Sequence, residues 1–100
     1  MRIVRAHKMT QGTAKQWIES QLPGLLREFG SSVRDLTHSW QGYVMEFSFS
    51  VDLGGRFRGT LQVTETDFAL DVPFGLLQRP FQGMARARME QWLNENLPDP

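Results

Sequence analysis

The sequence predicts an α+β fold: a two-layer sandwich in which an antiparallel sheet of about five strands carries two helices on one face. Apolar residues recur at three- and four-residue spacing in two segments, near residues 10–29 and 81–97, and alternate with a period of two in the segments between them. Each alternating segment has one apolar face, which is typical of an antiparallel sheet covered on one side. The predicted order is βαββββα, in one domain over residues 1–100 with a short disordered tail at 98–100.

The composition limits the classes of protein to consider. The chain has 100 residues, 40% of them hydrophobic, and its 11 basic and 11 acidic side chains cancel. One core of ordinary size is therefore expected, and the global charge gives no case for nucleic-acid binding. The chain has no cysteine, and its first residues form no continuous apolar segment. We expect a cytoplasmic protein without a transmembrane segment.

The first half of the chain contains a short strand at residues 2–6 and then a long helix. Thr10 or Thr13 is a candidate N-cap, and Gly30 stands where a left-handed C-cap belongs. Pro23 and Gly24 interrupt this helix, so it either kinks near Ser20 or divides into two short helices; the unbroken apolar phase favours a kink.

Four strands and a second helix follow. Leu36, His38 and Trp40 alternate with polar residues, "QG" turns the chain, and further alternation covers residues 43–51, 56–64 and 68–74. A helical period then runs from Phe81 to Leu97. The strand after "QG" and the last strand are candidate edges for a homodimer, but the order of strands in the sheet cannot be read from one sequence.

No catalytic or metal site emerges from the motifs. His7 and His38 have no partner at metal-ligand spacing, and both are interpreted as hydrogen-bonded structural histidines. "GGRFRG" belongs to a hairpin and not to a helix start, so it is interpreted as a turn with solvated arginines. No cofactor or metal is expected, and hydrolysis or thioester chemistry around His38 would lack a partnered nucleophile.

The segment "DVPFGLLQRPFQGMARARME" (residues 71–90) is unusually apolar and basic for a connection. Its apolar residues either close the core or form an exposed patch rimmed by arginines. Arg86 can pair with Glu90 four residues on, whereas Arg88 falls on the apolar stripe of the helix, where it would contact Trp92, pair with Asp71 or meet an anionic partner. The candidate ligand- or surface-binding residues are Phe74, Leu76, Leu77, Arg79, Phe81, Arg86 and Arg88.

The pattern resembles a known family on several stretches together. These are a first strand ending in His, a helix ending "EFG", the hairpin "GGRFRGTLQV" and the segment "DVPFGLLQRPFQGMARARMEQWLNENL". They are similar to the polyhydroxyalkanoic acid system proteins, small bacterial proteins associated with storage-granule gene regions; Phe74, Gly75, Leu76, Leu77, Pro80 and Phe81 fit that family's motif before the last helix. Pro23 and Gly24 depart from it, because that helix is usually continuous. The resemblance implies a cytoplasmic protein linked to polyhydroxyalkanoate granules or metabolism and carries over no catalytic residues.

Two functions follow as hypotheses. The first is a non-enzymatic accessory or binding protein that contacts an apolar surface, such as a granule, or a partner through residues 74–81. The alternative is a small carrier that binds an apolar, acyl-like ligand between the sheet and the C-terminal helix, in a pocket lined by Phe47, Phe49, Leu61, Leu70, Met84 and Trp92.

Overall fold

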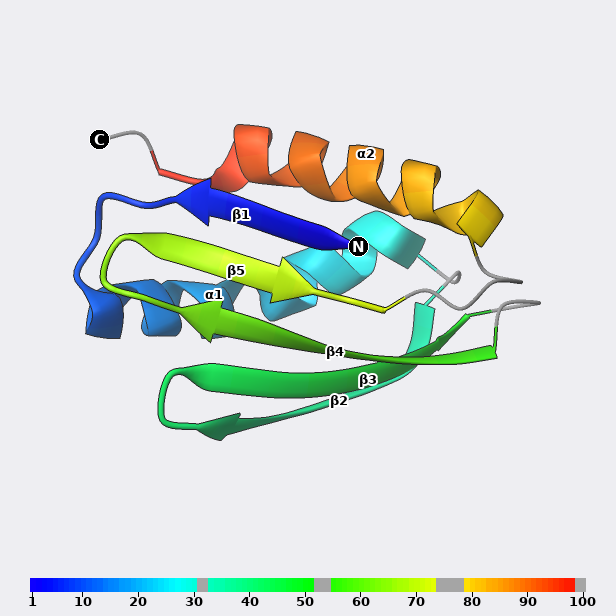
Figure 1. The fold of residues 1–100 in the computed structure, drawn as a ribbon, viewed down its shortest axis with the longest axis horizontal. Helices are drawn as coiled ribbons and strands as arrows, with labels where there is room; N and C mark the ends of the chain where they lie inside the picture. Colours follow the sequence, from blue (N-terminus) through cyan, green and yellow to red (C-terminus); the bar gives the residue numbers. More distant parts are fainter. Residues whose placement is uncertain (31–32, 52–54, 74–78, 99–100) are drawn as a thin grey trace.

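The predicted α+β order is confirmed by a computed structural model, which describes residues 1–30, 33–51, 55–73 and 79–98, with the backbone alone at 79–81. The elements are β1 (Arg2–Ala6), α1 (Gln11–Phe29), β2 (Val33–Gln41), β3 (Val44–Val51), β4 (Gly55–Val63), β5 (Asp67–Asp71) and α2 (Arg79–Asn96). The five strands form one antiparallel sheet in the order β1-β5-β4-β3-β2 (Figure 1).

The strand order corrects one expectation about the edges. The strand after "QG" is β3 and the last strand is β5, and each has a hydrogen-bonded neighbour on both sides. The edges of the sheet are β1 and β2 instead. Strands β2 to β5 follow one another as a meander, whereas β1 pairs with β5 from the other end of the chain, with Ile3 opposite Leu70.

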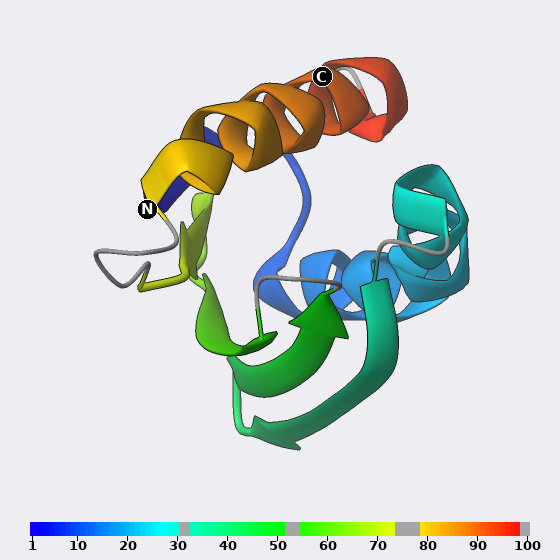
Figure 2. The ribbon, with the colours of Figure 1, turned by 90° about the vertical axis from the view of Figure 1, so that its right-hand side faces the viewer.

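The sheet is strongly curved, and both helices lie on its concave side (Figure 2). The first half of α1 packs deepest: Ala14 and Ile18 are buried against Met45, Leu61, Val63 and Phe68. The second half of α2 packs beside it, with Trp92 and Leu93 buried against Ile3. These two clusters therefore lie where the first half of α1 and the second half of α2 meet the sheet.

Helix α1 starts and bends as its sequence predicts. The Thr10 hydroxyl accepts a hydrogen bond from the Thr13 amide, and Gly30 ends the helix at a φ of 59°, a conformation that glycine tolerates best. Pro23 stays inside the helix and cannot donate to the Glu19 carbonyl, while the Ser20 hydroxyl donates to the Trp17 carbonyl at 2.7 Å. Figures 1 and 2 show the end of α1 turned away from the direction of its first half, as expected for a kink.

A bulge in β2 changes which residues face the helices. Arg34 lies opposite Ser50 and Thr37 opposite Ser48, so Asp35 and Leu36 together face one residue of β3. Asp35 has a φ of 55°, a left-handed conformation that aspartate adopts more readily than most residues. Because the bulge shifts the alternation by one, Val33 and Leu36 both point to the concave side.

A cleft between the two helices

A cleft of about 420 Å³ opens between α1, α2 and the concave face of the sheet. The two helices run in opposite directions, so the end of α1 and the start of α2 lie at the same end of the molecule (Figure 1). At the inner end of the cleft, Ile18 and Trp92 are buried. Towards the outer end, Phe29 and Val33 are only partly buried and Met84 is exposed, whereas Phe57 and Val72 of the sheet side are buried.

The floor of the cleft is apolar and rich in phenylalanine. Ile3, Leu70, Leu61 and Met45 lie side by side across four strands, and all four line the cleft. Beyond them the ring of Phe49 stacks between those of Phe47 and Phe57, with centroid distances of 6.1 and 5.4 Å. Sequence alternation puts these residues on one face, but only the curvature of the sheet gathers them into a concave floor.

Gly59 makes room for one of these rings. A Cβ at Gly59 would lie 2.6 Å from Cζ of Phe47 and 2.8 Å from the Asp71 carbonyl oxygen, both closer than real Cβ contacts. The Phe47 ring therefore lies directly over the glycine. A side chain at position 59 would push the ring into the cleft.

The second half of α1 forms one wall. Leu22, Leu25, Leu26 and Phe29 line the cleft, and all four are only partly buried. From Ile18 to Phe29 the helix axis is about 16 Å long, at 1.5 Å per residue. The fully buried residues of α1, Ala14 and Ile18, both belong to its first half. Leu22 and Leu25 still pack against the core clusters, and the apolar stripe continues beyond them to Leu26 and Phe29.

Helix α2 forms the opposite wall. Met84, Ala85, Arg88, Met89, Trp92 and Leu93 line the cleft at the spacing of one helix face. Their burial increases along the helix, from Met84, which is 59% exposed, to Trp92, which is 5% exposed. The Trp92 ring lies 5.8 Å from that of Trp17, so the helices meet at the inner end.

Few polar groups reach the cleft. Arg5 lines it and donates to the Asn94 side-chain oxygen at 2.5 Å. His38 also lines it and hydrogen-bonds to the Glu19 carboxylate at 3.0 Å, and the Trp40 indole donates to the same oxygen. The hydrogen bond from Trp40, with a smaller contribution from His38, lowers the pKa of Glu19 below its ordinary value of 4.5.

The predicted site residues fall into three groups. Phe74, Leu76 and Leu77 lie outside the described residues, so their role stays a prediction. Arg79 and Phe81 belong to the first turn of α2 by their backbone. Arg86 and Arg88 are described in full, and both are exposed.

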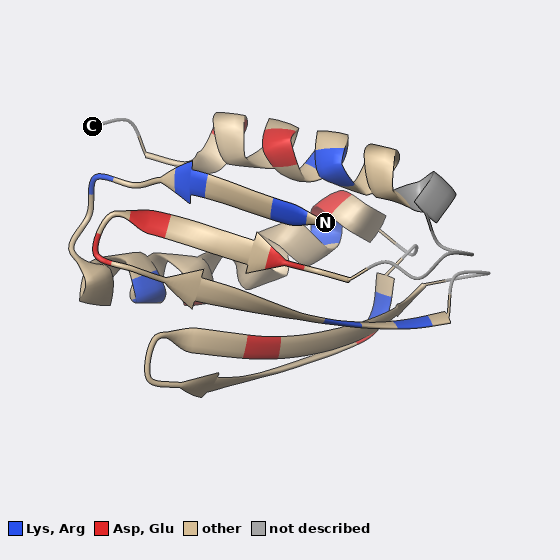
Figure 3. Cartoon of the chain, viewed as in Figure 1, with Lys and Arg blue, Asp and Glu red and all other residues tan. Residues whose placement is uncertain are grey.

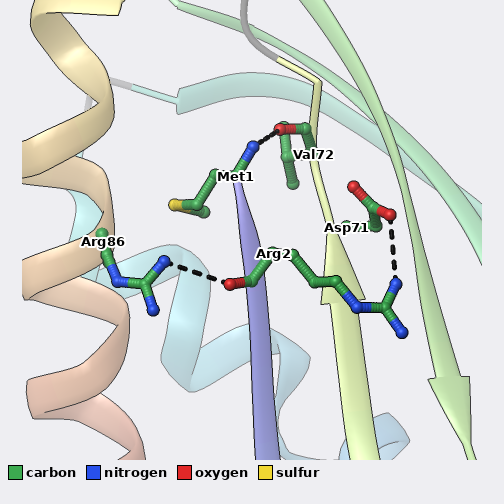
Figure 4. A network of polar contacts seen from close by, with 5 residues as sticks. All are labelled: Met1, Arg2, Asp71, Val72 and Arg86. Carbon is green, nitrogen blue, oxygen red and sulfur yellow. Dashed lines mark hydrogen bonds and ion pairs between the residues drawn. The ribbon is translucent and has the colours of Figure 1, made fainter.

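Arg86 pairs with Glu90 at 3.3 Å, as the spacing predicts. It also donates to the Arg2 carbonyl at 3.1 Å and so ties α2 to β1 (Figure 4). In the same view Arg2 pairs with Asp71 and the Met1 ammonium donates to the Val72 carbonyl. Arg86 is thus bound to the protein itself.

Arg88 has neither of the intramolecular partners proposed for it. Asp71 pairs with Arg2, and the cation–π contacts seen among the described residues are those of Lys15 with Trp40 and Tyr43. Arg88 lies instead on the lining of the cleft.

His7 is a structural histidine, as predicted. It is 5% exposed, its Nε2 lies 2.9 Å from the Thr64 carbonyl oxygen, and its Nδ1 accepts from the Met9 amide at 3.2 Å. A proton on Nε2 satisfies both contacts.

The six residues proposed for a carrier pocket all line this cleft. Sequence reasoning missed the α1 wall, above all Leu26, and Val33 on the floor. The signal for the wall is the second-half apolar cluster "LPGLLREF", which is wider than one core-facing stripe. No comparable signal reveals Val33, because its position depends on the bulge.

Comparisons with known proteins give a family and no individual relative. Neither the curated proteins nor the solved structures contain a match to the chain. No helix in the described ranges is both long and apolar enough to cross a membrane. The family described as "Putative polyhydroxyalkanoic acid system protein" matches residues 1–97, nearly the whole chain, and the chain belongs to that family.

Proposed function

We propose that this member of the polyhydroxyalkanoic acid system family is a non-enzymatic protein that binds an apolar, acyl-like ligand in the cleft between α1 and α2. The observation that carries the proposal is the cleft itself, which is enclosed on three sides by large apolar side chains. Its volume of about 420 Å³ lies within the ordinary range for small-molecule sites.

The energetics support a ligand. Leucine and phenylalanine side chains on both the wall and the floor remain partly exposed although they face one another across the cleft. Removing apolar surface from water stabilises a complex by about 25 cal/mol per Å². An apolar ligand would bury these leucine and phenylalanine side chains, as the core residues are already buried at the inner end of the cleft.

The size of the cleft suggests a chain of modest length. A volume of about 420 Å³ lies in the lower part of the roughly 300–1,000 Å³ range of small-molecule sites, which favours a short chain over a long lipid. An acyl chain of about ten carbons is therefore a suitable probe.

Titration with decan-1-ol tests the proposal, because Trp92 lines the cleft and reports on its polarity by fluorescence. We expect a saturable change. Leu26→Asp, which places a charge on the half-buried wall, should weaken binding about tenfold or more. Val4→Asp is the matched control, because Val4 is 53% exposed on β1 and does not line the cleft. A flat titration of the unmodified protein would contradict the proposal.

We propose, second, that residues 74–81 contact an apolar surface such as a polyhydroxyalkanoate granule. The observation that favours it is Met84, which is 59% exposed one turn after this segment. The double substitution of Leu76 and Leu77 by Asp should abolish co-sedimentation with isolated granules while circular dichroism stays unchanged. Undiminished co-sedimentation would refute surface contact, and unfolding would show that these leucines belong to the core.

A further inference from the structure

The charged side chains that line the cleft are basic. They are Arg5 and Arg88, and the lining includes no Asp or Glu among the described residues. The first half of α2 reinforces this asymmetry, since "RPFQGMARARM" contains three arginines and no acid before Glu90. In Figure 3 the blue band of α2 lies nearer the start of the helix than the red band.

Arg5 and Arg86, like His38, already have partners within the protein. Arg5 is held by Asn94, His38 by Glu19, and Arg86 by Glu90 and the Arg2 carbonyl. Within the described part of the chain, Arg88 has no hydrogen bond or ion pair.

The position of Arg88 is unusual for a cation without a partner. It follows Met84 and Ala85 by one turn and precedes Trp92 by another on the face of α2 that lines the cleft. Its side chain is exposed, so the guanidinium lies at the rim while its neighbours on the stripe form the apolar wall.

We infer that the ligand is a free alkanoate, whose chain occupies the cleft and whose carboxylate pairs with the Arg88 guanidinium. The inference rests on the proposed apolar binding function and adds the chemistry of the head group. A guanidinium binds a carboxylate through two parallel hydrogen bonds, and charge complementarity favours this occupant over a neutral or cationic amphiphile.

Comparison of three ten-carbon probes tests the head group: decanoate, decan-1-ol and decyltrimethylammonium. The unmodified protein should bind decanoate about fivefold more tightly than decanol, the upper end for an exposed ion pair, and the cationic probe most weakly. Raising the salt concentration should reduce the preference for decanoate over decanol, because an exposed pair is screened.

Substitutions of Arg88 test whether this residue causes the preference for decanoate over decanol. Arg88→Gln should bring decanoate affinity down to that of decanol measured on the same variant, whereas Arg88→Lys should retain part of the preference. Arg58→Gln is the matched control, since Arg58 is an exposed arginine of β4 that does not line the cleft. Thermal unfolding of each variant confirms that the fold is intact.

The outcomes separate the two proposals. Equal affinity of the unmodified protein for decanoate and decanol, or a preference that survives Arg88→Gln, would overturn the alkanoate assignment while apolar binding stands. Failure of every probe to bind would overturn both.

Discussion

The indole rings of Trp17 and Trp92 lie 5.8 Å apart between centroids, tilted by 43°, and this pair joins α1 to α2 at the inner end of the cleft. Trp17 also stacks on Phe68 of β5 at 5.7 Å, so one side chain connects both helices with the sheet.

Removal of the Trp92 side chain should therefore destabilise the whole fold. Trp92→Ala is expected to lower the free energy of unfolding by about 3–5 kcal/mol, because the ring is almost fully buried. Urea denaturation followed by circular dichroism measures the change. Tyr43→Ala, at a residue that is 40% exposed, should cost far less, and equal losses for the two variants would contradict the packing role of Trp92.

Two glycine substitutions should act in opposite directions. Gly59→Ala is expected to destabilise the protein by about 1–3 kcal/mol, because the new Cβ overlaps the Phe47 ring and the Asp71 carbonyl. Gly83→Ala, inside α2 with nothing within 4 Å of the added Cβ, should stabilise it by about 0.5–1 kcal/mol. Thermal unfolding of both variants checks the prediction, which fails if the two shifts share a sign.

The stability of the protein should depend on the shape of residue 35, which lies in the bulge of β2. Asp35→Ile is expected to cost about 1–2 kcal/mol, because a β-branched residue fits poorly at a φ of 55°. Asp35→Asn should be close to neutral, since asparagine tolerates the same conformation. Chemical denaturation distinguishes the two, and an isoleucine variant as stable as the asparagine variant would show that the strand can pair without the bulge.

The hydrogen bonds to Glu19 should make part of the stability depend on pH. Since the pKa of Glu19 is lowered on folding, its contribution is complete above the ordinary value of 4.5 and is lost as the pH falls through the lower pKa of the folded state. The unmodified protein should therefore exceed Glu19→Gln in stability at pH 6, with the difference shrinking as the pH falls below 4.5. Urea midpoints between pH 3 and 7 measure this, with Glu46→Gln on the polar face of β3 as the control for loss of one negative charge. A difference that is constant across this range would disprove the role of Glu19.

The sequence predicts the elements of this fold better than it predicts their spatial order. Alternation and helical spacing locate every strand and both helices, because one apolar face per element is a local property. The place of β1 beside β5 is not local: it depends on pairing between residues that are 61 positions apart (Ala6 and Asp67) to 69 positions apart (Arg2 and Asp71). The predicted last strand extended to Phe74, whereas β5 ends at Asp71.

In the candidate site, too, the sequence predicts the local features and not their arrangement in space. The phenylalanine floor and the stripe of α2 follow from periodicity, so the six proposed pocket residues do line one cleft. The α1 wall could not be separated from the core by periodicity alone, because Leu22 and Leu25 continue the stripe of Ile18 in phase. Only the bend of α1 and the curvature of the sheet leave them facing a cleft.

The position of β1 has a consequence for how the chain reaches its native state. Strands β2 to β5 can assemble from hairpins between neighbours, but β1 can pair only after β5 has been synthesised, since Met1 and Val72 are 71 positions apart in the chain. Until β5 has formed, Ile3 has no neighbouring strand, and α2 lacks the apolar surface against which Trp92 and Leu93 pack. Closure of the N-terminal strand should therefore be among the last steps of folding, and a nascent chain that has not yet exposed residues 67–71 would present an unpaired strand to chaperones.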